Sequence, residues 1–185
     1  ILAPKDGKEL EDMLEWSVTQ NLTISIRYPK AGMSDRNGQI RSPLQIGKAE
    51  TLYAPKEAKT LILAIGSMSW TAYEAALELA KEDIHCTVIN LRFAKPLDKN
   101  LLENLIQNHD HILIIEEGNK IGGVGTHIMQ HMAHLNKPLN QFHIMALPDE
   151  FVEHGKINTL LKKYGLTKEG IIKKIKEIST QKVFA

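Results

Sequence analysis

The sequence predicts an α/β protein in which helices cover both faces of a mostly parallel sheet. First, from about residue 48 onward, short apolar runs alternate with segments of helical period. Second, three of the runs are continuously apolar, as in strands buried on both faces; they are residues 60–65, 86–91 and 111–115. Third, Gly66 and Gly165 stand where a strand or a helix should end.

The first 33 residues predict a helix followed by a strand. Asp6 and Glu9 have the spacing of a capping box, with Asp in place of Ser or Thr. Apolar residues then recur at the helical period; they are Leu10, Met13, Leu14 and Val18. Residues 23–28 alternate in polarity, as a strand does, and Pro29 ends that pattern.

A linker is predicted at residues 34–47, because apolar residues become sparse while Gly, Ser, Asp, Asn and Pro accumulate. We therefore expect a domain boundary there. Beyond it, the predicted strands are residues 49–53, 60–65, 86–91, 111–115 and 142–147. The predicted helices cover residues 69–81, 98–106, 124–136, 157–164 and 167–179. Right-handed crossovers should join the parallel strands.

Composition narrows the function classes. The 185 residues carry 23 Lys plus Arg and 22 Asp plus Glu, so the net charge of +1 argues against a broad surface for nucleic acid or anionic membranes. The single cysteine, Cys86, excludes an internal disulfide and favours a reducing, cytoplasmic location. No apolar run approaches the roughly 20 residues of a membrane span. Cys86 itself is interpreted as core packing.

Two turns are candidates for anion binding. The turn after the first buried strand has only Gly66 of the three glycines of a dinucleotide fingerprint, so we interpret it as a plain connection. The second turn runs from Gly122 to Gly125 at a predicted helix N-terminus, where backbone amides attract anions. Glu116 and Glu117 precede it and would repel a phosphate. A structural turn is favoured there, and an anion site remains open.

Three histidines share the helix that follows this turn. His127, His131 and His134 stand at i, i+4 and i+7, and the first two have the histidine spacing of a zincin motif. The second motif position is Ile128 instead of the general-base Glu. Partly buried or interfacial histidines are therefore favoured over a metal site. From spacing alone we identify no catalytic, cofactor-binding or metal-ligating residues, and the chain has the features of a binding or assembly module.

A family resemblance extends over nearly the whole chain. Its most specific segments are Arg27-Tyr28-Pro29, Lys95-Pro96-Leu97-Asp98 and Pro148-Asp149 followed by Phe151-Val152-Glu153-His154-Gly155. Together with Ala3-Pro4-Lys5-Asp6 and the glycine turn, they resemble the C-terminal third of 1-deoxy-D-xylulose-5-phosphate synthases. These enzymes are thiamine-diphosphate-dependent transferases of the transketolase superfamily.

The resemblance implies a full-length homodimeric enzyme that condenses pyruvate with glyceraldehyde 3-phosphate, with loss of carbon dioxide, for isoprenoid and thiamine biosynthesis. Thiamine diphosphate and Mg²⁺ would be held by upstream domains of the same polypeptide, so no cofactor is expected on this chain alone. Residues 1–33 would be the tail of the pyrimidine-binding domain, 34–47 a linker, and 48–185 a three-layer transketolase C-terminal domain. This part would support the dimer and be inactive by itself.

One substrate-binding residue follows from the resemblance. The family usually has an Arg-Gly pair after Tyr-Pro, and that Arg helps to hold the phosphate of the acceptor aldehyde. Lys30 and Ala31 occupy these positions here. Lysine keeps the charge but lacks the bidentate fork of arginine.

Two alternatives stay open at this point. One is the C-terminal domain of another thiamine-diphosphate enzyme, such as a transketolase or a 2-oxoacid dehydrogenase β subunit. The other is a non-enzymatic module that binds an anion at the turn from Gly122 to Gly125.

Overall fold

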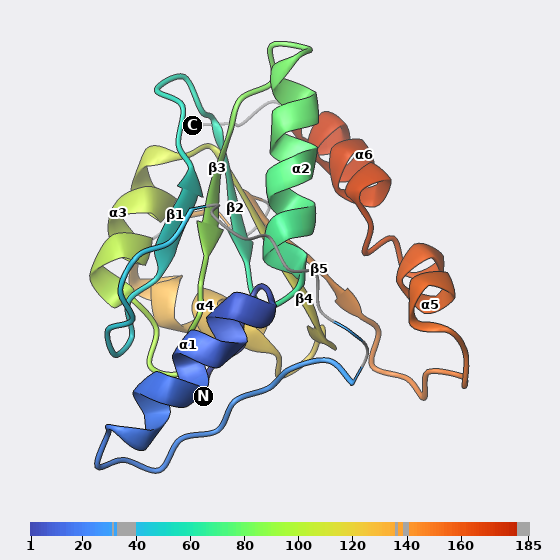
Figure 1. Ribbon diagram of the computed structural model, residues 1–185. Helices are drawn as coiled ribbons and strands as arrows, with labels where there is room; N and C mark the ends of the chain where they lie inside the picture. The colour runs from blue at the N-terminus through green and yellow to red at the C-terminus, as the bar shows by residue number, and fades with distance from the viewer. Residues whose placement is uncertain (31, 33–39, 136, 139–140, 181–185) are drawn as a thin grey trace.

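A five-stranded, mostly parallel sheet forms the centre of the molecule (Figure 1). The computed structural model describes residues 1–30, 32, 40–135, 137–138 and 141–180. The strands lie in the order β1-β3-β2-β4-β5; only β1 is antiparallel to its neighbour. Their bounds are Glu50–Tyr53 for β1, Thr60–Ala64 for β2, Cys86–Asn90 for β3, His111–Asn119 for β4 and Phe142–Leu147 for β5.

Helices cover both faces of the sheet, so the predicted three-layer α/β class is confirmed. One face carries α2 (Met68–Ala80) and α6 (Lys168–Ser179). The other carries α3 (Lys99–Asn108) and α4 (Val124–Met132), which a short 3₁₀ helix at Ala133–Leu135 extends. The remaining helices are α5 (Ile157–Lys163) and α1 (Gly7–Val18), the latter beyond the carboxyl ends of the parallel strands.

The central strand β2 explains why the apolar runs are continuous. Every residue of β2 is buried. Ile62 and Ala64 pack towards α2 and α6, whereas Leu61 and Leu63 pack towards α3 and α4. Because both faces of the strand are covered, alternation of polar and apolar residues disappears.

The N-terminal helix begins as predicted. The Asp6 carboxylate accepts a hydrogen bond from the backbone N of Glu9 at 2.8 Å, and the Glu9 carboxylate accepts one from the backbone N of Lys5 at 2.7 Å. This is close to a capping box, except that Glu9 accepts from the backbone N of Lys5, one residue before the N-cap Asp6. Only part of the predicted apolar stripe packs against the rest of the protein. Met13 is fully buried, whereas Leu14 and Val18 are exposed.

The strand predicted at residues 23–28 does not form, and that prediction was wrong. Only one bridge joins Ile26 to Leu2, which also bridges Phe93 on its other side. The backbone N of Leu2 donates to the Ser25 carbonyl oxygen at 2.8 Å. The alternating segment therefore pairs only with a few residues at the start of the chain, too short a partner for a ladder. Residues 34–39 of the predicted linker lie outside the described residues.

A cluster of buried charges fastens the first residues of the chain to the sheet. This buried charge cluster consists of Lys5, Glu9, Glu50 and Arg92 with the Asn90 amide, and each residue is at most 3% exposed. Lys5 Nζ lies 2.9 Å from Glu9 Oε1 and 2.6 Å from Glu50 Oε2. Arg92 pairs with the same two carboxylates, at 2.8 Å from Glu9 and 2.7 Å from Glu50. Two positive and two negative groups thus neutralise one another.

The cluster also includes the segment that leads into the sheet. Arg92 Nη2 donates to the Ser42 carbonyl oxygen at 2.9 Å, and the backbone N of Ser42 donates to Glu50 at 2.9 Å. Beside the cluster, Trp70 Nε1 donates to Asp6 at 2.9 Å. Burial would raise the pKa of Asp6, but the hydrogen bonds from Glu9 N and Trp70 lower it below its usual value. Three segments distant in sequence therefore share one hydrogen-bonded network.

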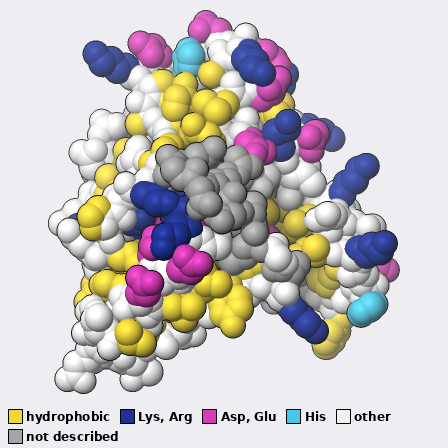
Figure 2. All heavy atoms as spheres, viewed as in Figure 1, with side chains coloured by type: hydrophobic (Ala, Val, Ile, Leu, Met, Phe, Trp, Pro, Cys, Tyr) yellow, Lys and Arg dark blue, Asp and Glu magenta, His cyan; other side chains and the backbone are white. Residues whose placement is uncertain are grey.

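The surface carries both charge signs, as the net charge implies. Figure 2 shows basic and acidic side chains interspersed over much of the face in view. Among the described residues, no helix has the length and apolar character needed to cross a bilayer.

We predict that Lys5→Met strongly destabilises the protein, because two buried carboxylates lose a partner. The expected loss is about 3–5 kcal/mol in the free energy of unfolding, measured by chemical denaturation. Lys8→Met is the matched control, since Lys8 also pairs with two acidic side chains but at the surface. Its denaturation midpoint should barely move. Equal midpoints for the two variants would contradict the importance of the buried cluster.

Candidate functional site at the carboxyl end of the sheet

The carboxyl ends of β2 and β4 form the place where a ligand would be expected. The chain leaves β2 for β3 on one side, and later returns to β4 on the other side. In open α/β sheets, ligands usually bind at such a switch point. Gly66 and Ser67 follow β2, and Glu116 and Glu117 lie towards the end of β4. The elements therefore bring both predicted turns to one edge.

The turn after β2 is covered by the start of the chain. Gly66 has a φ of +65°, and a Cβ placed there would lie 3.6 Å from the Ala3 Cβ and 3.9 Å from the Pro4 carbonyl oxygen. Residues 3 and 4 thus occupy the space in which a dinucleotide fold would place a phosphate. The interpretation of this turn as a plain connection agrees with the structure.

The second turn holds an internal anion. Glu116 is buried, and its carboxylate accepts hydrogen bonds from the backbone N of Gly125 at 2.8 Å and of Val124 at 3.1 Å. A Cβ on Gly123 would overlap this carboxylate and the Asn119 carbonyl oxygen. The amides at the start of α4 are therefore used by the protein itself. This geometry does not support the anion-binding module that the sequence left open.

The role of Glu116 was missed at the sequence level. In the sequence, Glu116 and Glu117 stand at the carboxyl end of a predicted parallel strand and are expected to repel a phosphate, with no role as a cap. The signal that could have revealed the cap was a glutamate near the end of a buried strand, eight residues before a helix start. Glu117 has a different role: Ser67 Oγ donates to its carboxylate at 2.5 Å, which joins the ends of β2 and β4.

Basic residues from the N-terminal segment approach the same edge. The guanidinium of Arg27 donates to the Glu117 carbonyl oxygen at 3.2 Å. Lys30 follows three residues later and is exposed. The cavity between these segments measures only about 90 Å³ and is lined mostly by apolar side chains with Arg27 and Glu116. It is far smaller than the roughly 300 Å³ at which small-molecule pockets begin.

Two of the three histidines, His131 at the end of α4 and His134 in the following 3₁₀ helix, lie near one carboxylate. Nε2 of His131 and Nε2 of His134 each lie 3.7 Å from Glu103 Oε1 on α3, while His127 is exposed. Burial lowers the pKa of His131. No group of three or more His, Cys, Asp or Glu side chains is arranged to hold a metal ion in the parts of the chain that the structure describes. The structure thus places His131 and His134 beside α3, whereas His127 is exposed.

Cys86 has the environment of a structural thiol. It is fully buried in β3, and burial raises its pKa to about 12. A thiol with so high a pKa supplies almost no thiolate at neutral pH and is a poor nucleophile. The interpretation of Cys86 as core packing agrees with this environment.

A diphosphate with its Mg²⁺ does not fit the residues at this edge. The backbone amides that would hold a diphosphate are bonded to Glu116, and the turn at Gly66 is covered by Ala3 and Pro4. The described part of the chain also offers no carboxylate group arranged for a metal ion. Around Gly66 and the start of α4, the carboxyl end is therefore closed and internally bonded.

We predict that Glu116→Ala exposes the anion-binding capacity of the α4 N-terminus. Wild-type protein should show no saturable change on titration with sulfate, whereas the variant should show backbone amide shifts at Val124 and Gly125 in NMR spectra. Glu116→Gln is the control, because its side-chain oxygen can still accept hydrogen bonds from the amides at the start of α4 and keep sulfate out. Glu116→Ala should also lose about 1–3 kcal/mol of stability, because the backbone amides of Val124 and Gly125 lose their partner. Sulfate-induced shifts of the same size in wild type would contradict the internal cap.

Comparison with known proteins identifies the fold family. Residues 47–171 match the model for the transketolase C-terminal domain. A 1-deoxy-D-xylulose-5-phosphate synthase of Alkaliphilus oremlandii is 38% identical over 96% of this chain, and one of Dictyoglomus thermophilum is 40% identical over 95%. A solved structure described as a split-gene transketolase in an inactive β4 tetramer has a TM-score of 0.81 at 25% identity, covering 97% of this chain and 56% of its own.

A transketolase from Campylobacter jejuni shares the fold, with a TM-score of 0.68 at 21% identity over 95% of this chain and 26% of its own. This chain spans only about 28% of the length of the two synthases. The alternation of strands and helices, the sheet order and the matched residues agree with one another. The chain belongs to the transketolase C-terminal domain family.

Proposed function

We propose that this chain forms the C-terminal part of a 1-deoxy-D-xylulose-5-phosphate synthase, which condenses pyruvate with glyceraldehyde 3-phosphate and releases carbon dioxide. One observation carries the proposal: eight curated relatives of this name align with 95–98% of the chain at 32–40% identity. A transketolase is less favoured, because the two solved transketolase structures share 25% and 21% identity. The names of the eight relatives likewise favour a synthase over a 2-oxoacid dehydrogenase β subunit.

In this proposal the chain supports the chemistry of other domains. Its carboxyl edge is closed by Ala3, Pro4 and the Glu116 carboxylate, and the buried thiol of Cys86 is no nucleophile. Thiamine diphosphate and Mg²⁺ belong to upstream domains of the same polypeptide. The full enzyme is a cytoplasmic homodimer of isoprenoid and thiamine biosynthesis.

The domain organisation is part of the same proposal. Residues 1–33 belong to the end of the pyrimidine-binding domain, residues 34–47 to a linker, and residues 48–185 to the C-terminal domain. The buried charge cluster supports a fixed orientation between the first and last of these parts, because Lys5 and Glu9 pair with Glu50 and Arg92. The N-terminal segment is thereby held at the carboxyl edge of the sheet.

Lys30 is the proposed contact to the acceptor phosphate. The segment before it is fixed at two points: the backbone N of Arg27 donates to the Leu2 carbonyl oxygen at 2.8 Å, and the Arg27 guanidinium donates to Glu117. Lys30 therefore extends from an anchored segment and is exposed, so its ammonium group is available to a ligand carried by another part of the enzyme. A lysine binds a phosphate as a point charge.

We predict that Lys30→Ala in the full-length enzyme raises the KM for glyceraldehyde 3-phosphate by about tenfold or more, because a charge-assisted hydrogen bond of about 1.5–3 kcal/mol is lost. The KM for pyruvate should change less than about twofold, since pyruvate carries no phosphate. Steady-state kinetics with each substrate varied in turn gives both values.

Two controls accompany this measurement. Lys30→Arg restores the charge and adds a bidentate fork, so it should keep the acceptor KM at or below the wild-type value. Lys168→Ala removes a lysine at the start of α6 and should change neither KM. Equal increases in both KM values for Lys30→Ala would contradict a phosphate contact.

A further inference from the structure

Two histidines occupy core positions at the amino end of the sheet, on the face that α6 covers. His111 is the first residue of β4, and His143 is the second residue of β5. Side chains alternate along a strand, and paired residues of parallel strands point to the same face, so both histidines share a face with Leu113, the Cα partner of His143. Leu113 belongs to the core that also contains Ile171 and Ile175 of α6. The two histidines therefore stand where apolar side chains normally pack.

The two rings are neighbours, and each has one nitrogen in the interior. Their centroids are 6.1 Å apart, with 41° between the ring planes. His111 is only 6% exposed, and His143 is partly buried. Nδ1 of His111 and Nε2 of His143 are both buried and have no hydrogen-bond partner among the described residues. Because buried polar atoms are nearly always hydrogen-bonded, this pair costs free energy that an apolar pair would not.

On the α6 side, the charged groups that act on His143 leave a proton there uncompensated. These groups are Lys174 and Glu177, which already pair with each other at 3.0 Å. The Glu177 side chain is also 54% exposed to solvent. Burial, Lys174 and the ring of His111 lower the pKa of His143, and Glu177 opposes them with a smaller effect. The His143 ring is therefore mostly neutral at pH 7.

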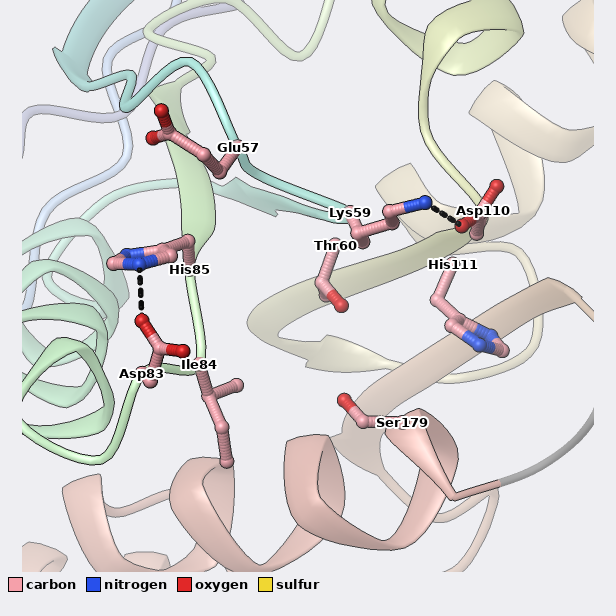
Figure 3. A pocket seen from close by; sticks show the side chains of 9 residues that line it. All are labelled: Glu57, Lys59, Thr60, Asp83, Ile84, His85, Asp110, His111 and Ser179. Carbon is pink, nitrogen blue, oxygen red and sulfur yellow. Dashed lines mark hydrogen bonds and ion pairs between the residues drawn. The ribbon is translucent and has the colours of Figure 1, made fainter.

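The charges around His111 are likewise paired or exposed. Burial lowers the pKa of His111 most strongly, Asp110 acts in the opposite direction, and Lys137 lowers it further. Asp110 is 48% exposed and lies 3.6 Å from the Lys59 ammonium group. Figure 3 shows these two residues and the uncharged Ser179 of α6 around a cavity that His111 also lines. The other titratable residues of this cavity lie across it from His111; they are Glu57, Asp83 and His85.

A third buried histidine nearby shows a different arrangement. Nδ1 of His109 lies 2.7 Å from the Leu105 carbonyl oxygen, and its Nε2 lies 2.9 Å from the Thr87 hydroxyl oxygen. Nδ1 must donate to the carbonyl oxygen, so Nε2 accepts from the hydroxyl group and the ring is neutral. Burial also lowers the pKa of His109. Since its partners lie in α3 and β3, its titration acts on those elements, whereas the pair of His111 and His143 lies beneath α6.

We propose that His111 and His143 form an acid-sensitive contact that keeps α6 on the sheet at neutral pH and releases it on acidification. While both rings are neutral, they pack as part of the core under α6. A proton on either ring adds a charge beside a nitrogen that has no partner among the described residues. Because the rings lie 6.1 Å apart, the first proton also repels the second. The effect acts at the amino end of the sheet, away from the carboxyl edge.

The direction of the pH dependence follows from the lowered pKa values. A histidine in an unfolded or detached segment titrates at about pH 6.5. Burial lowers the pKa of both rings in the closed structure, so the open state binds more protons below that pH. The contact therefore contributes its full stability above about pH 6.5 and loses it as the pH falls towards the lowered pKa values.

The test measures amide hydrogen exchange of α6 in the 185-residue chain at about pH 7.5 and 5.5, corrected for the intrinsic pH dependence of exchange. We expect opening at Ile175 and Ile178 to increase at least about tenfold at the lower pH, because a pKa difference of about one unit changes the equilibrium between two states about tenfold. Exposed carboxylates stay ionised over this range and contribute little. NMR titration of the two imidazole rings should give apparent pKa values below about 6.5.

A double variant makes the test specific. His111→Leu combined with His143→Leu removes both titrating rings and keeps the positions apolar. The increase in α6 opening at the lower pH should then fall below about twofold. His127→Leu is the matched control, because His127 is exposed on α4 at the other face of the sheet. This control should keep the full increase of the wild-type chain.

Three results would overturn the proposal. One is a wild-type chain in which α6 opens equally often at both pH values. Another is a pair of rings that titrate at or above about pH 6.5 in the folded chain. The third is a double variant that keeps the tenfold increase. Because the first two measurements use the wild-type chain, they decide the question even when the double variant fails to fold.

Discussion

The buried charge cluster is the interaction on which the rest of the structure depends. Two carboxylates, Glu9 and Glu50, each pair with both Lys5 and Arg92, so removing any one member leaves a charge in the interior without a full set of partners. Isolated buried charges are costly, so the four groups are stable only when assembled. Because they come from the first helix, the first strand and the end of β3, their assembly fixes the positions of all three.

The same constraint shapes the carboxyl edge of the sheet. With Lys5 fastened in the cluster, Ala3 and Pro4 pass over the turn at Gly66, where related topologies bind ligands. At the neighbouring strand, Glu116 supplies the anion that the start of α4 attracts. The protein's own residues therefore occupy both potential ligand sites, the turn at Gly66 and the start of α4. A family member closed in this way is suited to positioning other parts of an enzyme, with Arg27 anchoring the segment that carries Lys30.

Local patterns made most of the fold predictable. The continuous apolar run of β2 and the spacing of Asp6 and Glu9 were sufficient to predict a doubly covered sheet and a capped helix. The strand prediction for residues 23–28 was wrong because alternating polarity shows that a segment can form a strand. It does not show that a partner strand is available for pairing. Charges were harder: Lys5, Glu50 and Arg92 are separated by more than 40 positions, so nothing local indicates that they meet. Asp98 is the N-cap residue of α3, but its carboxylate makes no cap hydrogen bond and instead accepts from Lys48 and from the backbone N of Ala49.

The most direct test compares the full 185-residue chain with a chain of residues 48–185, which contains nearly all of the matched family domain. The measurement is the free energy of unfolding from urea denaturation monitored by circular dichroism. The account predicts that the shorter chain loses at least about 3–5 kcal/mol or fails to unfold cooperatively, because Glu50 and Arg92 lose Lys5 and Glu9. A shorter chain that unfolds cooperatively with an unchanged midpoint would contradict the central role of the buried charge cluster.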